Sequence, residues 1–354
     1  MRVTHYARRS LGAGALALAL AACANDTGPS DFNAQGTTAD MAAAQGAFAS
    51  AQATSFTAIG ADISGVMGGS PLVASSARLA MTGPSAASAR YARQLAAFAP
   101  RAGRGIQASA ASMPSEVLGK TFVWDESADQ YVVSGEAGAP ATGVRFLLYA
   151  VDPVQLRPVE PVVEVGYVDI IDQSTATATD FRIKVVEGSV VYLDYDVAAS
   201  SSASTGIVTI SGFASNGSTI ANFDLRNTIS ENAGGLVLSL DYDLTVPSRD
   251  GALNWSATFA NISETEVVVT LDLAISGPNG QVRLLGTYGV DGGSLSVKVN
   301  GDPFATITLV EGGATITGAG GAALTAEEEA TLETILDYYE VSLTVFAELV
   351  APLD

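Results

Sequence analysis

The chain has 354 residues, 48% of them hydrophobic and 15% charged, so it is long and apolar enough to bury a full core. Its 37 acidic residues outnumber 17 Lys and Arg, and the net charge of −20 disfavours nucleic acid and anionic lipid headgroups as partners. The only histidine is His5 and the only cysteine is Cys23, so the chain beyond them cannot hold a Ser–His–Asp triad, a His-ligated zinc ion or a disulfide of its own.

The first 22 residues have the form of an export signal. Three arginines precede an apolar run at residues 11–20, which is too short to cross a bilayer as a helix. The run ends in Leu20-Ala21-Ala22-Cys23. In residue type and position, these four residues resemble the lipobox of bacterial lipoproteins. The resemblance covers residues 1–23 only, and it implies cleavage between Ala22 and Cys23, a diacylglyceryl thioether on the sulfur and acylation of the new amino group.

A lipid anchor on Cys23 would place the chain in the bacterial cell envelope, because two or three acyl chains make release from a membrane negligible. The next residue is Ala24. An aspartate at that position would resemble the inner-membrane retention signal of enteric bacteria. Because Ala24 stands there instead, we expect the outer membrane, on its periplasmic or its surface side. Residues 23–39 are polar and aperiodic, and we expect the lipidated N-terminus followed by a tether.

Residues 40–110 read as a helical leader. Apolar side chains recur at steps of three or four residues after Asp40, which could cap a helix there. The apolar positions are Phe48, Phe56, Ile59, Ile63 and Met67, and the polar Gln52 falls in the same series. A second helix is expected at residues 85–99, between Pro84 and Pro100.

Residues 117–316 form a long series of alternating apolar and polar positions, which predicts antiparallel strands with one buried and one wet face. In residues 236–246, Leu238, Leu240 and Tyr242 share one face, whereas Ser239 and Asp241 share the other. Short turns rich in Gly, Asn and Asp separate the strands and indicate a meander of hairpins. The expected strands are 121–124, 130–133, 143–151, 162–171, 181–187, 190–197, 207–213, 219–229, 236–246, 253–259, 267–276, 282–288, 295–299 and 304–310.

The last expected element is an amphipathic helix at residues 324–351. Thr325 and Glu328 form a capping box, and an apolar stripe runs to Val350. The glycine-rich pieces before it, residues 312–313 and 318–321, are interpreted as turns or linker.

These parts together predict a mainly β protein with flanking helices. A sheet of thirteen or fourteen strands exceeds what a flat, open sheet tolerates, so it must curl, close or fold double. We expect a large curved antiparallel meander or half-open barrel, with the N-terminal helices and the one C-terminal helix on its apolar face. A β-sandwich is the alternative.

The sequence shows no catalytic motif, and we predict no enzyme activity, cofactor or metal site. The nearest arrangement is Asp194 with Asp196 and Asp241 with Asp243, which could hold calcium if their two strands were brought together. A carboxylate pair could also serve a hydrolase without histidine. A solvated acidic face accounts for the same residues without chemistry.

The predicted function is that of an envelope-anchored lipoprotein of structural or interaction type. The alternative is a carrier of lipid or another apolar ligand beneath a helical lid. An apolar pocket for such a ligand would use the inward side chains Leu238, Leu240, Tyr242, Trp255, Phe259 and Leu271. The expected partners are the membrane, through Cys23, and an envelope protein or apolar small molecule.

Overall fold

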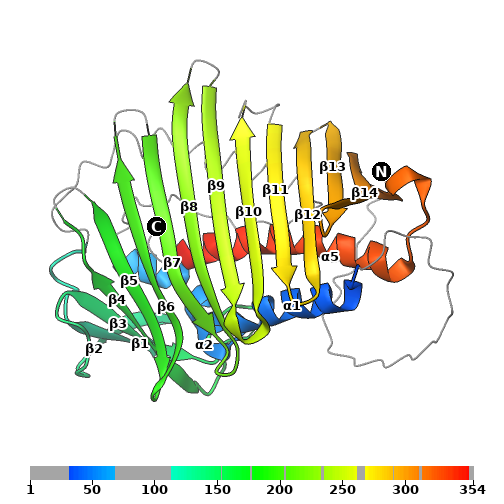
Figure 1. The fold of residues 1–354 in the computed structure, drawn as a ribbon. Helices are drawn as coiled ribbons and strands as arrows, with labels where there is room; N and C mark the ends of the chain where they lie inside the picture. Colours follow the sequence, from blue (N-terminus) through cyan, green and yellow to red (C-terminus); the bar gives the residue numbers. More distant parts are fainter. Residues whose placement is uncertain are drawn as a thin grey trace, which may run out of the picture.

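The computed structural model describes residues 32–67, 113–152, 154–175, 178–202, 205–232, 235–260, 268–289, 291–310 and 313–350 (Figure 1). The expected signal, Cys23 and the expected helix at residues 85–99 lie outside the described residues.

In the described residues, fifteen strands form one continuous sheet, ordered β15-β14-β13-β12-β11-β10-β9-β8-β7-β6-β5-β4-β3-β1-β2. From β3 to β15 each strand pairs antiparallel with the next one in sequence, which confirms the meander. The strands are β1 (Lys120–Asp125), β2 (Gln130–Ser134), β3 (Gly143–Tyr149), β4 (Glu164–Asp172), β5 (Thr179–Glu187), β6 (Val190–Ser201), β7 (Thr205–Ser215), β8 (Ile220–Asn232), β9 (Gly235–Val246), β10 (Gly251–Ala260), β11 (Val268–Gly277), β12 (Gly280–Gly289), β13 (Gly292–Val299), β14 (Asp302–Val310) and β15 (Gly313–Gly318).

The sheet is strongly curved and stays open, because β2 and β15 each pair with one neighbour only (Figure 1). The half-open form of the prediction is therefore confirmed. The alternative of two stacked sheets is wrong, since every described strand belongs to the same sheet.

Two parts of the sheet differ from the expectation. β3 lies beside β1 and runs parallel to it, with Lys120 opposite Val144 and Phe122 opposite Phe146. The chain crosses back after the β1–β2 hairpin, whereas the predicted pattern of successive hairpins made every pair antiparallel. β15 also forms where glycines suggested only turns or linker, because Ile316 pairs with Ile307 of β14 and packs against the core.

The leader helices are α1 (Ala34–Ala47), α2 (Ala51–Ala58) and α3 (Gly60–Val66). α1 begins inside the segment expected to be a polar tether and includes Asp40, so the predicted boundary and cap were wrong. The N-cap is Asn33, whose side chain accepts a hydrogen bond from the Gly36 backbone N–H at 2.8 Å. Ser50 starts α2 in the same way by accepting from the Ala53 N–H at 3.0 Å, which divides the leader into separate helices.

The C-terminal helix α5 (Ala326–Val350) agrees with the prediction, including its capping box. The Thr325 backbone N–H donates to Glu328 Oε2 at 2.7 Å, and the Glu328 N–H donates to Thr325 Oγ1 at 3.2 Å. Three glutamates occupy the first turn, where the helix dipole stabilises negative charge.

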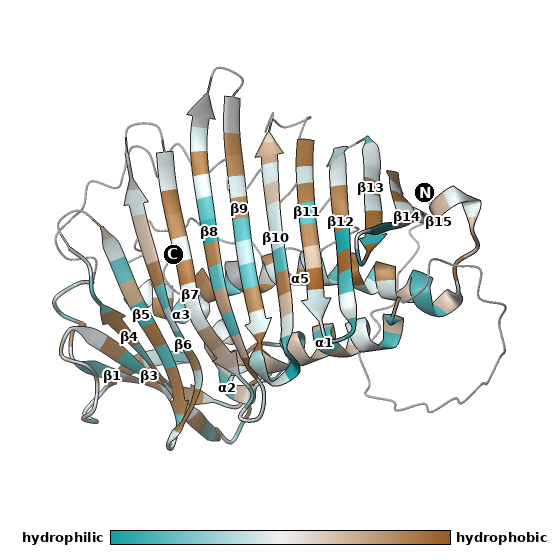
Figure 2. Ribbon diagram, viewed as in Figure 1, coloured by the Kyte–Doolittle hydropathy of each residue, from teal (hydrophilic) through white to brown (hydrophobic). Residues whose placement is uncertain are grey.

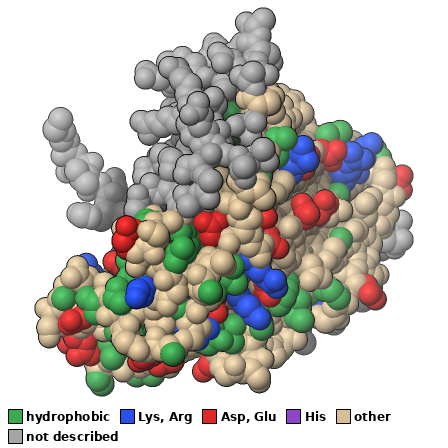
Figure 3. Space-filling view, turned by 90° about the vertical axis from the view of Figure 1, so that its left-hand side faces the viewer, with side chains coloured by type: hydrophobic (Ala, Val, Ile, Leu, Met, Phe, Trp, Pro, Cys, Tyr) green, Lys and Arg blue, Asp and Glu red, His purple; other side chains and the backbone are tan. Residues whose placement is uncertain are grey.

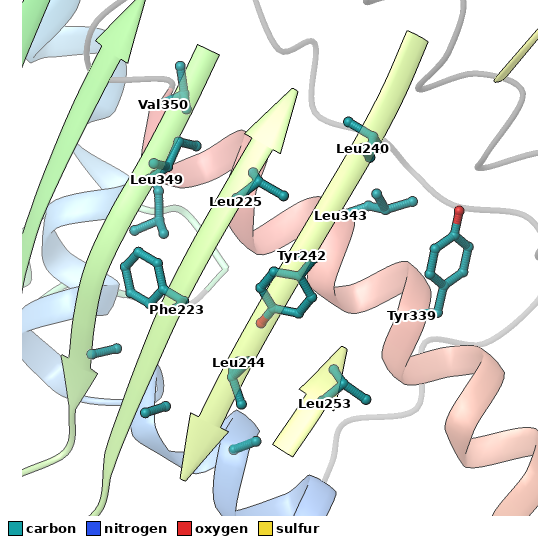
Figure 4. Packing of buried hydrophobic residues seen from close by; sticks show 14 of the residues in the cluster. Phe223, Leu225, Leu240, Tyr242, Leu244, Leu253, Tyr339, Leu343, Leu349 and Val350 are labelled. Carbon is teal, nitrogen blue, oxygen red and sulfur yellow. The ribbon is translucent and has the colours of Figure 1, made fainter. Parts of the chain in front are cut away.

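The core lies between the concave face of the sheet and the helices, which cross the strands on that side (Figure 1). Apolar and polar residues alternate along the strands, so that the brown and teal bands of Figure 2 change from one residue to the next. Figure 4 shows Leu225 of β8 and Tyr242 of β9 facing Tyr339 and Leu343 of α5. All four side chains are at least 97% buried.

Candidate functional site

The six residues of the predicted apolar pocket lie together on the concave face. Leu238, Leu240 and Tyr242 come from β9, Trp255 and Phe259 from β10, and Leu271 from β11; none is more than 2% exposed.

Trp255 packs against β9 and against α5. The Trp255 ring lies 5.1 Å from the Tyr339 ring of α5 in an edge-on arrangement, and 5.3 Å from the Tyr242 ring. Tyr195, an inward residue of β6, is fully buried and donates a hydrogen bond to the Leu349 carbonyl of α5 at 2.8 Å. α5 thus packs directly on the strands at these positions.

A small space lies between α1 and the strands near Asp40. Its volume is about 20 Å³, enough for one water molecule, and Met41, Leu244, Leu253 and Tyr338 line it. A ligand with an acyl chain would need several hundred cubic ångströms.

The leader helices follow the hairpin turns at one end of the strands, and we call these turns the lower rim. The β5–β6 turn is reached by Gln52 of α2, whose Nε2 donates to Glu187 Oε2 at 2.7 Å. The β7–β8 turn is reached by α1, since Asn216 Nδ2 donates to the Gly46 carbonyl at 2.9 Å.

Asp40 continues this series of contacts to the next two turns of the lower rim. Its Oδ1 lies 3.3 Å from Arg249 Nε in the β9–β10 turn. Its Oδ2 accepts from Asn279 Nδ2 in the β11–β12 turn at 3.2 Å, and Asn279 Oδ1 in turn accepts from Asn33 Nδ2 at 2.9 Å. Four successive turns of the lower rim are therefore joined to the 20 residues of the leader from Asn33 to Gln52.

The far end of the leader lies near the β1–β2 hairpin. Burial raises the pKa of Asp62 in α3, the neighbouring Arg157 lowers it, and Asp129 in the hairpin turn raises it further. Burial likewise raises the pKa of Tyr131 in β2, whose hydroxyl donates to the Leu147 carbonyl at 2.8 Å. Tyr131 and Asp62 thus belong to the packing of this end.

The convex face carries the aspartates that the sequence singled out, and the fold keeps them apart. β7 and β8 lie between β6 and β9, so Asp194 and Asp196 are three strand spacings, roughly 14 Å, from Asp241 and Asp243. Arg182 also engages Asp194 with two hydrogen bonds, of 2.8 and 2.9 Å. Among the described residues, no three His, Cys, Asp or Glu side chains are grouped so that they could hold a metal ion.

A shallow, open depression on the convex face was not foreseen from the sequence. It measures about 300 Å³ and lies over β9 to β12. Asp241, Asp243, Asn254, Asp272 and Arg283 line it together with Ser256 and Gln281. Arg283 donates to Oδ1 of Asp272 at 2.7 Å, which lowers the pKa of that carboxyl. The cross-strand register creates this hollow, so only the pairing of β9 to β12 could have revealed it.

The β1–β6 end of the convex face has a mixed charge. Acidic and basic side chains alternate on the side shown in Figure 3. Arg145 pairs with Asp169 across β3 and β4 at 2.7 Å and also covers the Tyr167 ring, with its guanidinium carbon 3.7 Å from the ring centre. Such pairs fix the orientation of the outer side chains but contribute little stability where water reaches them.

Comparison with protein-family models, curated proteins and solved structures finds no match for this chain. The structure therefore defines this chain by its architecture: one open, curved sheet of fifteen described strands, whose concave side is covered by helices. In the described part of the chain, the helices lack the length and apolar content needed to cross a membrane.

Proposed function

We propose that this chain is a lipoprotein anchored in the bacterial cell envelope through Cys23, and that it acts by contact with other envelope components. The observation that carries the anchor is the Leu20-Ala21-Ala22-Cys23 sequence at the end of a basic and apolar leader. The anchor needs no spanning helix, because acyl chains alone retain a protein on a bilayer.

The packing of the concave face supports an interaction role over transport of an apolar ligand. The six inward residues proposed for a pocket are buried, and Trp255 packs against Tyr242 of β9 and Tyr339 of α5. The space between α1 and the strands near Asp40 holds about one water molecule. The convex face, in contrast, is open and polar, and its depression over β9 to β12 gives a partner a shaped surface to contact.

Metabolic labelling with a radioactive or clickable palmitate tests the anchor. The wild-type chain should incorporate label and sediment with membranes, whereas Cys23→Ser should lose both properties. A matched control moves the thiol instead of removing it: Cys23→Ser with Ser30→Cys should also stay unlabelled, because the new cysteine lacks a lipobox. Labelling of either variant would contradict the proposal.

Native mass spectrometry of the soluble Cys23→Ser form separates contact from transport. A chain that only makes contacts should give the mass of the polypeptide alone after mild purification. A stoichiometric adduct with the mass of a lipid would instead establish the carrier.

A further inference from the structure

We propose that the anchored molecule meets the membrane with one particular end of its sheet, namely β12 to β15, which we call the proximal end. The β1–β4 end then lies farther from the lipid surface. This inference rests on the proposed anchor at Cys23 and adds the orientation of the folded part.

The first two described residues, Phe32 and Asn33, pack at the proximal end of the sheet. The Phe32 ring packs edge-on against the Phe304 ring of β14, with 5.0 Å between their centres. Asn33 follows directly and bonds to Asn279 in the β11–β12 turn. The residue nearest the anchor in the described chain is therefore attached to β14 and to the lower rim beside it.

The start of α5 contacts the start of α1 at the proximal end. Thr331 Oγ1 of α5 lies 3.2 Å from Thr38 Oγ1 of α1 and 3.4 Å from the Ala34 carbonyl oxygen. Figure 1 shows both helices starting near β12 to β14 and running toward the other end of the sheet. The first turns of α1 and α5 thus hold each other where the leader enters the fold.

The length of the segment between Cys23 and Phe32 limits how far the proximal end can move from the lipid. Nine peptide units connect Cys23 to Phe32, and an extended chain gains at most about 3.5 Å per residue, so the reach is about 30 Å. From β14 to β2 there are thirteen strand steps, which at about 4.8 Å each make roughly 60 Å along the curved sheet. The tether therefore reaches only about half the length of the sheet.

The charge of the proximal end indicates that this end is held near the lipid surface by the tether and does not bind the lipid itself. Glu327, Glu328 and Glu329 occupy the first turn of α5, close to where the leader enters. Carboxylates at this position repel phosphate-bearing headgroups. The short tether, not an attractive surface, then determines which end is near the bilayer.

Quenching of a fluorophore by lipid-borne nitroxides measures this orientation. Cys23 is the only native cysteine and its sulfur is acylated in the anchored chain, so a second cysteine can be labelled specifically in the full lipidated chain. Thr315→Cys on β15 and Gln130→Cys on β2 are matched positions, since both are exposed polar residues on the two end strands of the sheet. The labelled proteins are bound to phosphatidylcholine vesicles containing a nitroxide headgroup lipid.

We expect at least threefold stronger quenching at position 315 than at position 130. Equal quenching, or stronger quenching at position 130, on protein that floats with the vesicles would overturn the orientation and leave the anchor intact. Failure of the acylation-competent chain to float with the vesicles would overturn both the anchor and the orientation.

A lengthened tether checks that chain length is the cause. Twenty Gly and Ser residues inserted after Ser30 should reduce the difference between the two positions to less than 1.5-fold, because the fold could then turn freely. An undiminished difference in that variant would overturn the inference that the tether sets the orientation.

Discussion

At the scale of single residues, Asp40 shows how a correct observation can lead to a wrong role. Its position before an apolar repeat suggested an N-cap, but Asn33 takes that role seven residues earlier. Asp40 instead lies within α1 with its side chain 12% exposed, where one carboxylate joins two turns of the lower rim through Arg249 and Asn279. Helix propensity rules describe near neighbours along the chain and cannot find partners more than 200 residues away.

We predict that Asp40→Ala lowers the free energy of unfolding by about 1–2 kcal/mol, because it removes the contacts with Arg249 and Asn279 and leaves their donors unpaired. The ion pair itself contributes modestly, since Arg249 is 41% exposed. Urea unfolding followed by circular dichroism measures the change. Asp241→Ala on the exposed convex face is the control and should stay within about 0.5 kcal/mol of wild type.

Tyr195 should make stability depend on pH at alkaline values. Burial raises the pKa of its phenol well above the ordinary value of 10.0. Above pH 10 the unfolded chain therefore loses this proton while the folded chain keeps it, and stability falls as the pH rises. The Tyr195→Phe variant lacks this ionisable group. Above pH 10 its free energy of unfolding should therefore fall by about 1.4 kcal/mol less per pH unit than that of the wild type.

Denaturant titrations at several values between pH 9 and 11 check this prediction for Tyr195. At pH 7 the variant should be less stable by about 1 kcal/mol, because the Leu349 carbonyl loses its hydrogen bond. Parallel curves for wild type and variant across the alkaline range would contradict the burial of this phenol.

At the scale of elements, strands and the terminal helix could be predicted well, because their signals are local. An alternation of period two records which positions face the core, and the Thr325–Glu328 capping box marks a helix start within four residues. β15 was missed because its flanking glycines suggest turns. Residues 193–196 of β6 and 240–243 of β9 share the sequence Leu-Asp-Tyr-Asp, and Phe-Ala follows each at a similar distance, at 213–214 and 259–260. The similarity has limits: Tyr195 and Tyr242 both point inward, whereas Phe213 lies opposite Asp194 on the outer face and Phe259 is buried in the core.

For α5 we predict that Ile335→Ala costs about 2–5 kcal/mol, since this side chain is fully buried between the helix and the sheet. Glu333→Ala is the matched control on the same helix, because Glu333 is exposed, and it should change stability by about 0.5 kcal/mol or less. Thermal or urea unfolding measures both variants. A small effect of Ile335→Ala would mean that α5 contributes little to holding the sheet.

At the scale of the whole molecule, the helices connect strands that do not touch one another. A meander by itself has only contacts between adjacent strands, and such one-dimensional arrays can lose cooperativity when they are long. Here the leader joins the turns from β5 to β12, and α5 packs against residues from β6 to β10. These cross-connections should make the sheet unfold as one unit.

The two tryptophans test this cooperativity at separate places. Trp124 lies on β1 beside Tyr131, and Trp255 lies on β10 under α5. Fluorescence of Trp124→Phe and Trp255→Phe variants should each give a single urea transition, with the same fraction unfolded as circular dichroism gives for that variant. A tryptophan transition that precedes the loss of secondary structure in either variant would show that the two ends unfold separately.

The amino-acid sequence by itself determined the alternation of buried and wet positions, the number of strands to within two, the terminal helix and the absence of His and Cys beyond Cys23. These properties are local or compositional, so no knowledge of the fold was needed. Only the tertiary structure decided that β3 lies parallel to β1, that Asp194 and Asp241 lie on strands separated by two others, and that Tyr339 of α5 packs on Trp255 of the proposed pocket. The physical reason is that each of these outcomes depends on contacts such as that of Asn33 with Asn279, whose partners are 246 residues apart and share no pattern in the sequence.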